Sequence, residues 1–200
     1  MHYAAILGGA SLLLFSVSAT SMAIAAEKTF KLEEATIADI QEAMSAGALT
    51  AEKLVELYVD RIAAYDDAGP KINSILKVNP RARAEAAALD LERKIKGPRG
   101  PLHGVPVLLK DNIDTADMPT TNGSAVLRDA IPPDDAVITK ALRKAGAVIL
   151  GKAAMGEFAG GSYNSVRGQT INPYNVKRNT GGSSSGSGAA ISANFAVLAI

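Results

Sequence analysis

Cysteine is absent from this 200-residue chain, and histidine occurs only at His2 and His103. The absence of cysteine excludes disulfide bonds, a thiolate nucleophile, a cysteine-ligated zinc ion and lipid attachment to a cysteine within these residues. A serine–histidine–aspartate triad formed from this sequence would have to use His103. Histidine is therefore nearly unavailable as a base for nucleophilic chemistry.

Aromatic residues and net charge are also scarce. Aromatic side chains make up 4% of the chain, and the formal net charge is +1. Few rings are available to stack on bases, and no strong field attracts nucleic acid or anionic lipid, so we expect no nucleic-acid partner. Apolar residues make up 48% and charged residues 20%, as in an ordinary globular protein. The chain is long enough for one domain with a hydrophobic core.

Charged side chains are missing from residues 1–26, and the first of them is Glu27. Residues 4–19 form an apolar stretch, and Ala23–Ala25 fits the small-x-small pattern of a signal-peptidase site. We therefore expect residues 1–25 to be a cleaved signal peptide, which makes the protein periplasmic or secreted and free of the membrane after cleavage. An uncleaved membrane anchor and a misassigned start codon are the alternatives.

The rest of the chain alternates helical patterns with buried strands. A strand such as 105–109, which is apolar on both faces, is typical of a sheet covered on both sides. The alternation predicts an α/β domain with a mixed or largely parallel sheet over residues 26–200. Helices are expected at about 37–46, 50–65, 80–96, 134–144 and 189–194, and strands at 72–78, 105–109, 147–150 and 196–200.

The glycine- and serine-rich tract 181–188 admits three interpretations. A flexible linker has this composition, but the turn at 172–175 before it and the apolar run 189–195 after it argue against one. A phosphate-binding loop is disfavoured because no lysine follows the last glycine. In a catalytic loop, the glycines would let a serine approach other chain segments in a strained conformation.

Lys110 ends the apolar run 105–109 and is the candidate base for such a serine. A hydroxyl needs a neighbouring base before it can attack an amide, and a lysine serves as one only in its neutral form, which burial favours. The alternative is a lysine that extends to water or pairs with Asp111.

We expect His103 to make a structural hydrogen bond. Asp111, Asn112 and Asp114 are expected to cap a turn and position Lys110 rather than to bind a metal.

These motifs together resemble the amidase signature family, and in particular bacterial secreted amidases of the peptide amidase type. The resemblance covers about residues 30–200 and implies the N-terminal part of an amidase signature fold, a mixed sheet flanked by helices. Its motifs occur in family order at Thr50–Tyr65, Gly100–Pro106, Lys110–Asn112, Ala145–Lys152, Gly168–Tyr174 and Gly181–Ser187.

By this resemblance Lys110 is the general base, and Ser183, beside an unusual cis peptide bond, relays protons. Gly181, Gly182, Ser184 and Ser185 form the supporting loop. The nucleophilic serine is expected a few residues beyond Ile200, so residues 1–200 alone should be inactive. The resemblance implies a small-molecule or peptide amide as substrate, and no cofactor or metal.

Two other functions stay open at this point. The chain could be a non-catalytic truncated relative or a binding fragment, because it holds no nucleophile at the expected spacing. It could also be the A-type subunit of an amidotransferase, which supplies ammonia for transfer-RNA-linked glutamine synthesis. The expected signal peptide and the near-neutral charge argue against the amidotransferase.

Overall fold

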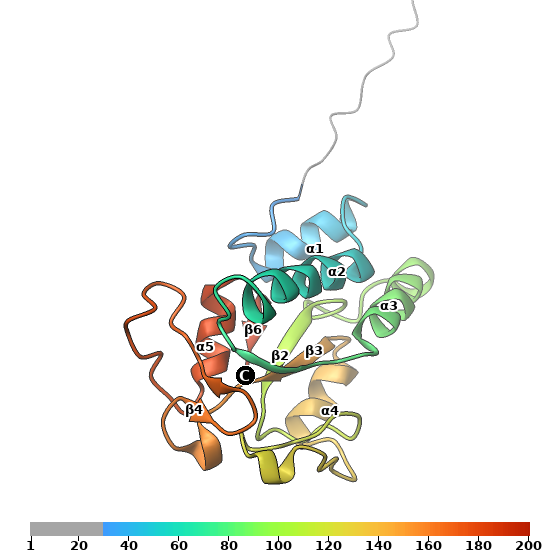
Figure 1. Cartoon of the computed structure of the whole chain (residues 1–200). Coiled ribbons are helices and arrows are strands. Elements are labelled where there is room, and N and C mark those ends of the chain that lie inside the picture. Colours follow the sequence, from blue (N-terminus) through green and yellow to red (C-terminus); the bar gives the residue numbers. More distant parts are fainter. Residues whose placement is uncertain (1–29) are drawn as a thin grey trace, which may run out of the picture.

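The computed structural model describes residues 30–200 (Figure 1). The predicted signal peptide, residues 1–25, lies outside the described residues. Within residues 30–200, no helix is both long enough and apolar enough to cross a bilayer.

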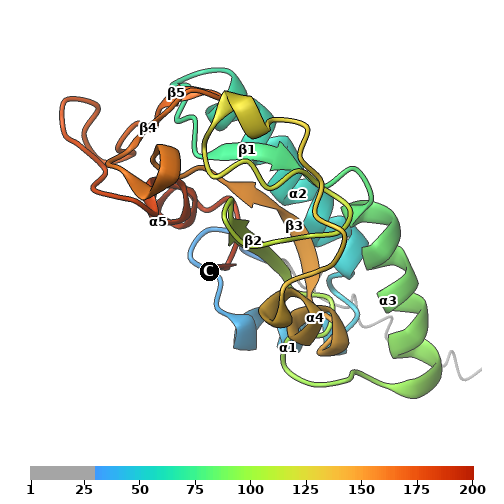
Figure 2. The ribbon, with the colours of Figure 1, turned by 90° about the horizontal axis from the view of Figure 1, so that it is seen from below.

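A four-stranded mixed sheet forms the centre of the domain, with the strand order β1-β3-β2-β6 (Figures 1 and 2). β2 is parallel to both β3 and β6, and β1 is antiparallel to β3. The α/β prediction with a mixed sheet is therefore confirmed. The strands are β1 (Ile75–Val78), β2 (Pro106–Lys110), β3 (Val148–Ala153) and β6 (Leu198–Ala199), and a separate hairpin joins β4 (Tyr163–Asn164) to β5 (Gly168–Gln169).

The first two helices begin where their caps predict. At the start of α1 (Ile37–Ser45), the Asp39 amide donates to the Thr36 hydroxyl at 3.2 Å, and the Thr36 amide donates to the Asp39 carboxylate at 2.9 Å. At the start of α2 (Ala51–Ile62), the Thr50 hydroxyl accepts the Lys53 amide at 3.0 Å. Each cap satisfies backbone donors that have no partner inside the helix.

Three later helices differ from the sequence prediction at their first turns. Residues 134–135 do not open α4, because the Asp135 carboxylate accepts the Ala116 amide and binds the Arg143 guanidinium instead. The last helix starts earlier than expected, inside the serine tract. The three helices are α3 (Ala82–Lys96), α4 (Val137–Lys144) and α5 (Ser185–Ser192); short helical turns lie at Ala63–Asp67, Ala125–Leu127 and Glu157–Ala159.

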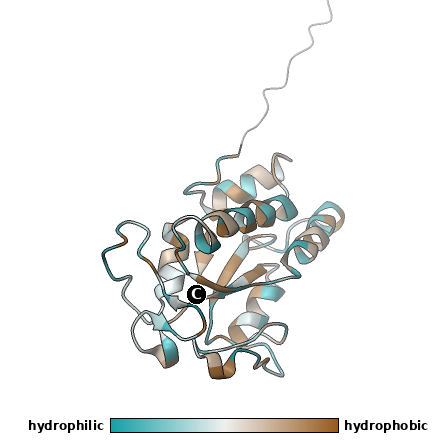
Figure 3. Cartoon of the chain, in the orientation of Figure 1, coloured by the Kyte–Doolittle hydropathy of each residue, from teal (hydrophilic) through white to brown (hydrophobic). Residues whose placement is uncertain are grey.

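Helices cover both faces of the sheet, and alternate residues of β2 belong to different apolar clusters. Leu108 packs in the cluster that also contains buried residues of α1, α2, α3 and α5. Val107 and Leu109 pack on the other face with Leu142 of α4. Figure 3 shows these hydrophobic strands at the centre of the domain. Because successive side chains of a strand point to opposite faces, Lys110 continues the face of Leu108.

The first turn of α5 packs directly on the end of β3, which gives a test of the fold. A Cβ at Gly186 would clash with backbone atoms of Ala154 and Ser74, whereas a Cβ at Gly188 would meet nothing. We expect Gly186→Ala to lower the free energy of unfolding by about 1–3 kcal/mol. Gly188→Ala, in the same helix, should raise it by about 0.5–1 kcal/mol. Urea denaturation followed by circular dichroism measures both; equal effects would contradict this packing.

Candidate active site

Lys110 and Ser183, which lie 73 residues apart in the sequence, meet at the carboxyl end of β2. The Lys110 Nζ donates a hydrogen bond to the Ser183 Oγ at 2.7 Å, and both residues are half-buried. In α/β sheets, functional groups gather where parallel strands end, and both β2 and β3 end at this edge. The structure therefore brings together the two residues to which the sequence assigned the base and the relay. The alternative that pairs Lys110 with Asp111 is wrong.

The serine tract is a folded part of the domain and not a linker. Its Gly182–Ser183 peptide bond is cis, at the position that the sequence resemblance implies. The Ser183 carbonyl accepts the Gly156 amide at 3.0 Å, and a Cβ at Gly182 would clash with the Gly161 carbonyl. The backbone on both sides of the cis bond is thus held against residues 156–161, which fixes the direction of the Ser183 side chain.

The other serines of the predicted loop, Ser184 and Ser185, make no hydrogen bond to Lys110. Ser185 is buried, and its hydroxyl donates to Thr170 at 3.2 Å. Ser184 is exposed and precedes the first turn of α5, and Gly181 is exposed with a φ of 74°. Their roles as supporting residues stay predictions.

The loop 156–161 is a part of the site that sequence reasoning missed. Phe158 and Ala159 have positive φ values of 46° and 66°, in the left-handed region that residues with a side chain seldom adopt. The Phe158 amide donates to the Asn122 carbonyl at 2.9 Å, which holds this loop. Such conformations concentrate at functional sites, where the surrounding structure enforces them. The sequence signal is weak, because only the neighbouring glycines mark the loop.

Asp111 and Lys152 form a second polar pair beneath the end of β2. The Lys152 side chain is fully buried, and its Nζ lies 3.8 Å from the Asp111 Oδ1 and 2.8 Å from the Thr120 hydroxyl. Burial raises the pKa of Asp111, which its hydrogen bond with Thr121 and the charge of Lys152 counteract. Burial also lowers the pKa of Lys152, against the charge of Asp111. Each group thus offsets part of the cost of burying the other.

His103 has the structural role that the sequence predicts. Its buried ring accepts the Arg99 amide at Nδ1, at 3.2 Å, and Nε2 lies 2.9 Å from the Leu89 carbonyl oxygen. This tautomer places the ring proton on Nε2, and both ring nitrogens have hydrogen-bond partners.

Asn112 and Asp114 are exposed, while the Asp111 carboxylate caps the turn by accepting the Thr121 and Gly123 amides. Among residues 30–200, no group of His, Asp or Glu is arranged to hold a metal.

The family model for amidases matches residues 53–200, nearly three quarters of the chain. The chain belongs to the amidase family. A putative amidase of Schizosaccharomyces pombe is 42% identical over 177 residues, which cover 84% of this chain and 30% of that protein. The A-type subunit of the glutamyl-tRNA(Gln) amidotransferase of Streptomyces coelicolor is 45% identical over 168 residues, which cover 82% of this chain and 33% of that protein.

A solved amidase shares this fold. The peptide amidase of Stenotrophomonas maltophilia superimposes with a TM-score of 0.82 at 44% identity, over 86% of this chain and 36% of that enzyme. The mixed sheet with flanking helices is therefore the amidase signature fold, as the sequence resemblance implies. The chain spans about a third of the length of the relatives it matches.

Proposed function

We propose that these residues carry the lysine–serine half of an amide hydrolase. The observation that carries the proposal is the 2.7 Å hydrogen bond between Lys110 and Ser183 at the end of β2. The amidase family match and the similarity to a peptide amidase support amide bonds as the target. In this proposal Lys110 is the general base, Ser183 relays protons, and the attacking serine follows residue 200.

The reaction proceeds through an acyl-enzyme. The attacking serine oxygen bonds to the amide carbonyl carbon and passes its proton to the Ser183 oxygen, and the Ser183 proton moves to the Lys110 amine. When the carbon–nitrogen bond breaks, the proton returns along the same path to the leaving amine or ammonia. Water then attacks the ester in the same manner and releases the acid. The direct contact of Lys110 with Ser183 is the segment of this path that the described residues supply.

The substrate that we propose is a small-molecule or peptide amide, in line with the peptide amidase among the similar structures. We also propose that the protein is exported, on the grounds of the uncharged stretch 1–26 and the Ala23–Ala25 step. Neither proposal requires a cofactor, because the proton transfers need only the lysine and the two serines.

A second candidate is an amidotransferase A-type subunit, because such a protein of Streptomyces coelicolor is 45% identical to this chain. The two candidates differ in location and partners. An exported hydrolase would act on a free amide, whereas a subunit of this kind would release ammonia from an amide donor for a partner. Reading the gene past the codon for Ile200 separates both from a non-catalytic relative: a Gly-Gly-Ser step shortly after it supports an enzyme, and a stop codon contradicts one.

Lys110→Ala should abolish amide hydrolysis by the complete enzyme while the fold is kept. Removing a general base typically costs about 10²–10⁴-fold in rate, and a half-buried lysine at a strand end contributes little packing. Turnover of a peptide amide and circular dichroism measure the two effects. Lys77→Ala, an exposed lysine in β1 of the same sheet, is the matched control and should keep full activity. Near-normal turnover of Lys110→Ala would refute the assignment.

Ser183 should be essential without becoming acylated. Ser183→Ala is expected to lose activity as severely as Lys110→Ala, because it interrupts the same proton path, while Ser192→Ala at the end of α5 should not. A fluorophosphonate probe, located by peptide mass spectrometry, should label a serine beyond residue 200. A probe adduct on Ser183 would show that this serine is the nucleophile and not the relay.

The export proposal predicts the first residue of the mature protein. Mass spectrometry of the protein made in its natural host should find an N-terminus at Ala26 or Glu27, and the protein outside the cytoplasm. An intact Met1 in the cytosolic fraction would contradict export and would favour the amidotransferase candidate.

A further inference from the structure

Lys152 is a buried lysine that the proposed proton path does not use. In the parallel register of β2 and β3, Lys152 is the partner of Leu109 and Ala153 is the partner of Lys110. Partner residues of neighbouring strands share a face, so Lys152 and Lys110 point to opposite faces of the sheet. The Lys152 side chain therefore lies on the face of the sheet opposite to Lys110 and cannot reach Ser183.

Asp111 connects Lys152 to the proposed base. It follows Lys110 in the chain, and its amide continues the strand ladder by donating to the Ala153 carbonyl at 3.0 Å. The chain thus sends the Lys110 side chain to the Ser183 face and the Asp111 side chain to the Lys152 face. The Asp111 Oδ1 is buried without a hydrogen bond, and the Lys152 Nζ at 3.8 Å is the cation that faces it.

The Asp111 carboxylate also orders the loop that supports the serine side of the site. Its Oδ2 accepts the Thr121 hydroxyl, the Thr121 amide at 3.1 Å and the Gly123 amide at 3.2 Å. The next residue in that turn, Asn122, accepts the Phe158 amide. From there the loop 156–161 reaches Ser183 through the bond from the Gly156 amide. The buried Asp111 carboxylate therefore holds the backbone segments that position both Lys110 and Ser183.

We propose that Asp111 and Lys152 are positioning residues that hold Lys110 and Ser183 at hydrogen-bond distance. Asp111 acts on Lys110 through the shared backbone, and on Ser183 through residues 121–123 and 156–161. Lys152 keeps the Asp111 carboxylate in place by offsetting its burial. This inference rests on the proposed function of the pair, and it adds two residues to the machinery that touch neither the substrate nor the attacking serine.

Two variants of the complete enzyme test the proposal at temperatures where each is folded. Lys152→Met keeps the length of the side chain without its charge, and Asp111→Asn keeps the shape of the carboxylate. A loose catalytic geometry should lower kcat roughly 10²-fold, the effect of a misplacement of about 1 Å, and leave KM within a few-fold. A purely structural role would lower the melting temperature and leave kcat of the folded enzyme unchanged, which would overturn the proposal.

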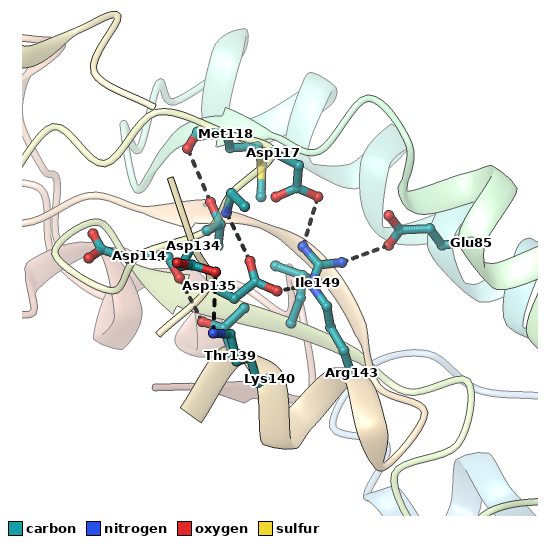
Figure 4. Close-up of polar contacts among 12 residues, drawn as sticks. Glu85, Asp114, Asp117, Met118, Asp134, Asp135, Thr139, Lys140, Arg143 and Ile149 are labelled. Atoms are coloured by element: carbon teal, nitrogen blue, oxygen red, sulfur yellow. Dashed lines mark hydrogen bonds and ion pairs between the residues drawn. The ribbon is translucent and has the colours of Figure 1, made fainter. Parts of the chain in front are cut away.

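Asp117→Asn is the matched control. Asp117 belongs to the same loop, and its carboxylate binds Arg143 of α4 at 2.7 Å (Figure 4) and Arg81 at 2.6 Å, away from Lys110. This variant removes the charge of a loop carboxylate that pairs with two arginines, so it should lose stability and keep kcat. A loss of kcat as large as that of Asp111→Asn would mean that any change in this loop disturbs the site, and it would contradict a specific role of the pair.

Hydrogen exchange provides a readout that needs no substrate. In Lys152→Met and Asp111→Asn, the amides of Gly156 and Ile113 should exchange faster than in the unchanged protein, and in Asp117→Asn they should not.

If the unchanged enzyme hydrolyses no amide, the proposed function fails, and this comparison of exchange rates still decides the positioning role. If a single variant does not fold, Thr120→Val keeps both charges, removes the hydroxyl 2.8 Å from the Lys152 Nζ, and should show the same acceleration in weaker form. Unchanged exchange would overturn the proposal.

Discussion

The alternation of side chains at the end of β2 is the constraint on which the site depends. Leu108 and Lys110 point to one face of the sheet, and Leu109 and Asp111 lie toward the other. A shift of this strand by one residue would exchange the faces and remove the lysine from Ser183. Such a shift is costly at the end of the strand, because Lys110 would take the buried place of Leu109. The register of this strand end thus places the proposed base.

Close backbone packing brings the serine to that base. Gly182 lies against the Gly161 carbonyl, and Gly186 lies against the end of β3 and the residue before β1, at distances that leave no space for a Cβ. These contacts attach the serine tract to the sheet edge that carries Lys110. The tract has the composition of a linker, yet its glycines serve the opposite purpose, since they permit approach to other backbone segments rather than free movement.

The sequence predicts best what local interactions decide. The caps at Thr36 and Thr50 and the buried strand that ends in Lys110 follow from neighbouring residues, and the Lys110–Ser183 pairing follows from family motifs in order. The early start of α5 is not predictable from propensity, because a Ser-Gly-Ser-Gly turn favours helix poorly and its packing on β3 overrides that preference. The burial of Lys152 also depends on a carboxylate about forty residues away in the sequence, which periodicity does not reveal.

The proposed site depends on the direct contact between Lys110 and Ser183. A crystal structure of the protein at a resolution that places side chains measures this most directly. We expect a separation of 2.7 Å between the Lys110 Nζ and the Ser183 Oγ, with Asp111 turned to Lys152 on the other face. A Lys110 side chain that extends to solvent or pairs with Asp111, with Ser183 out of its reach, would refute the proposed catalytic pair.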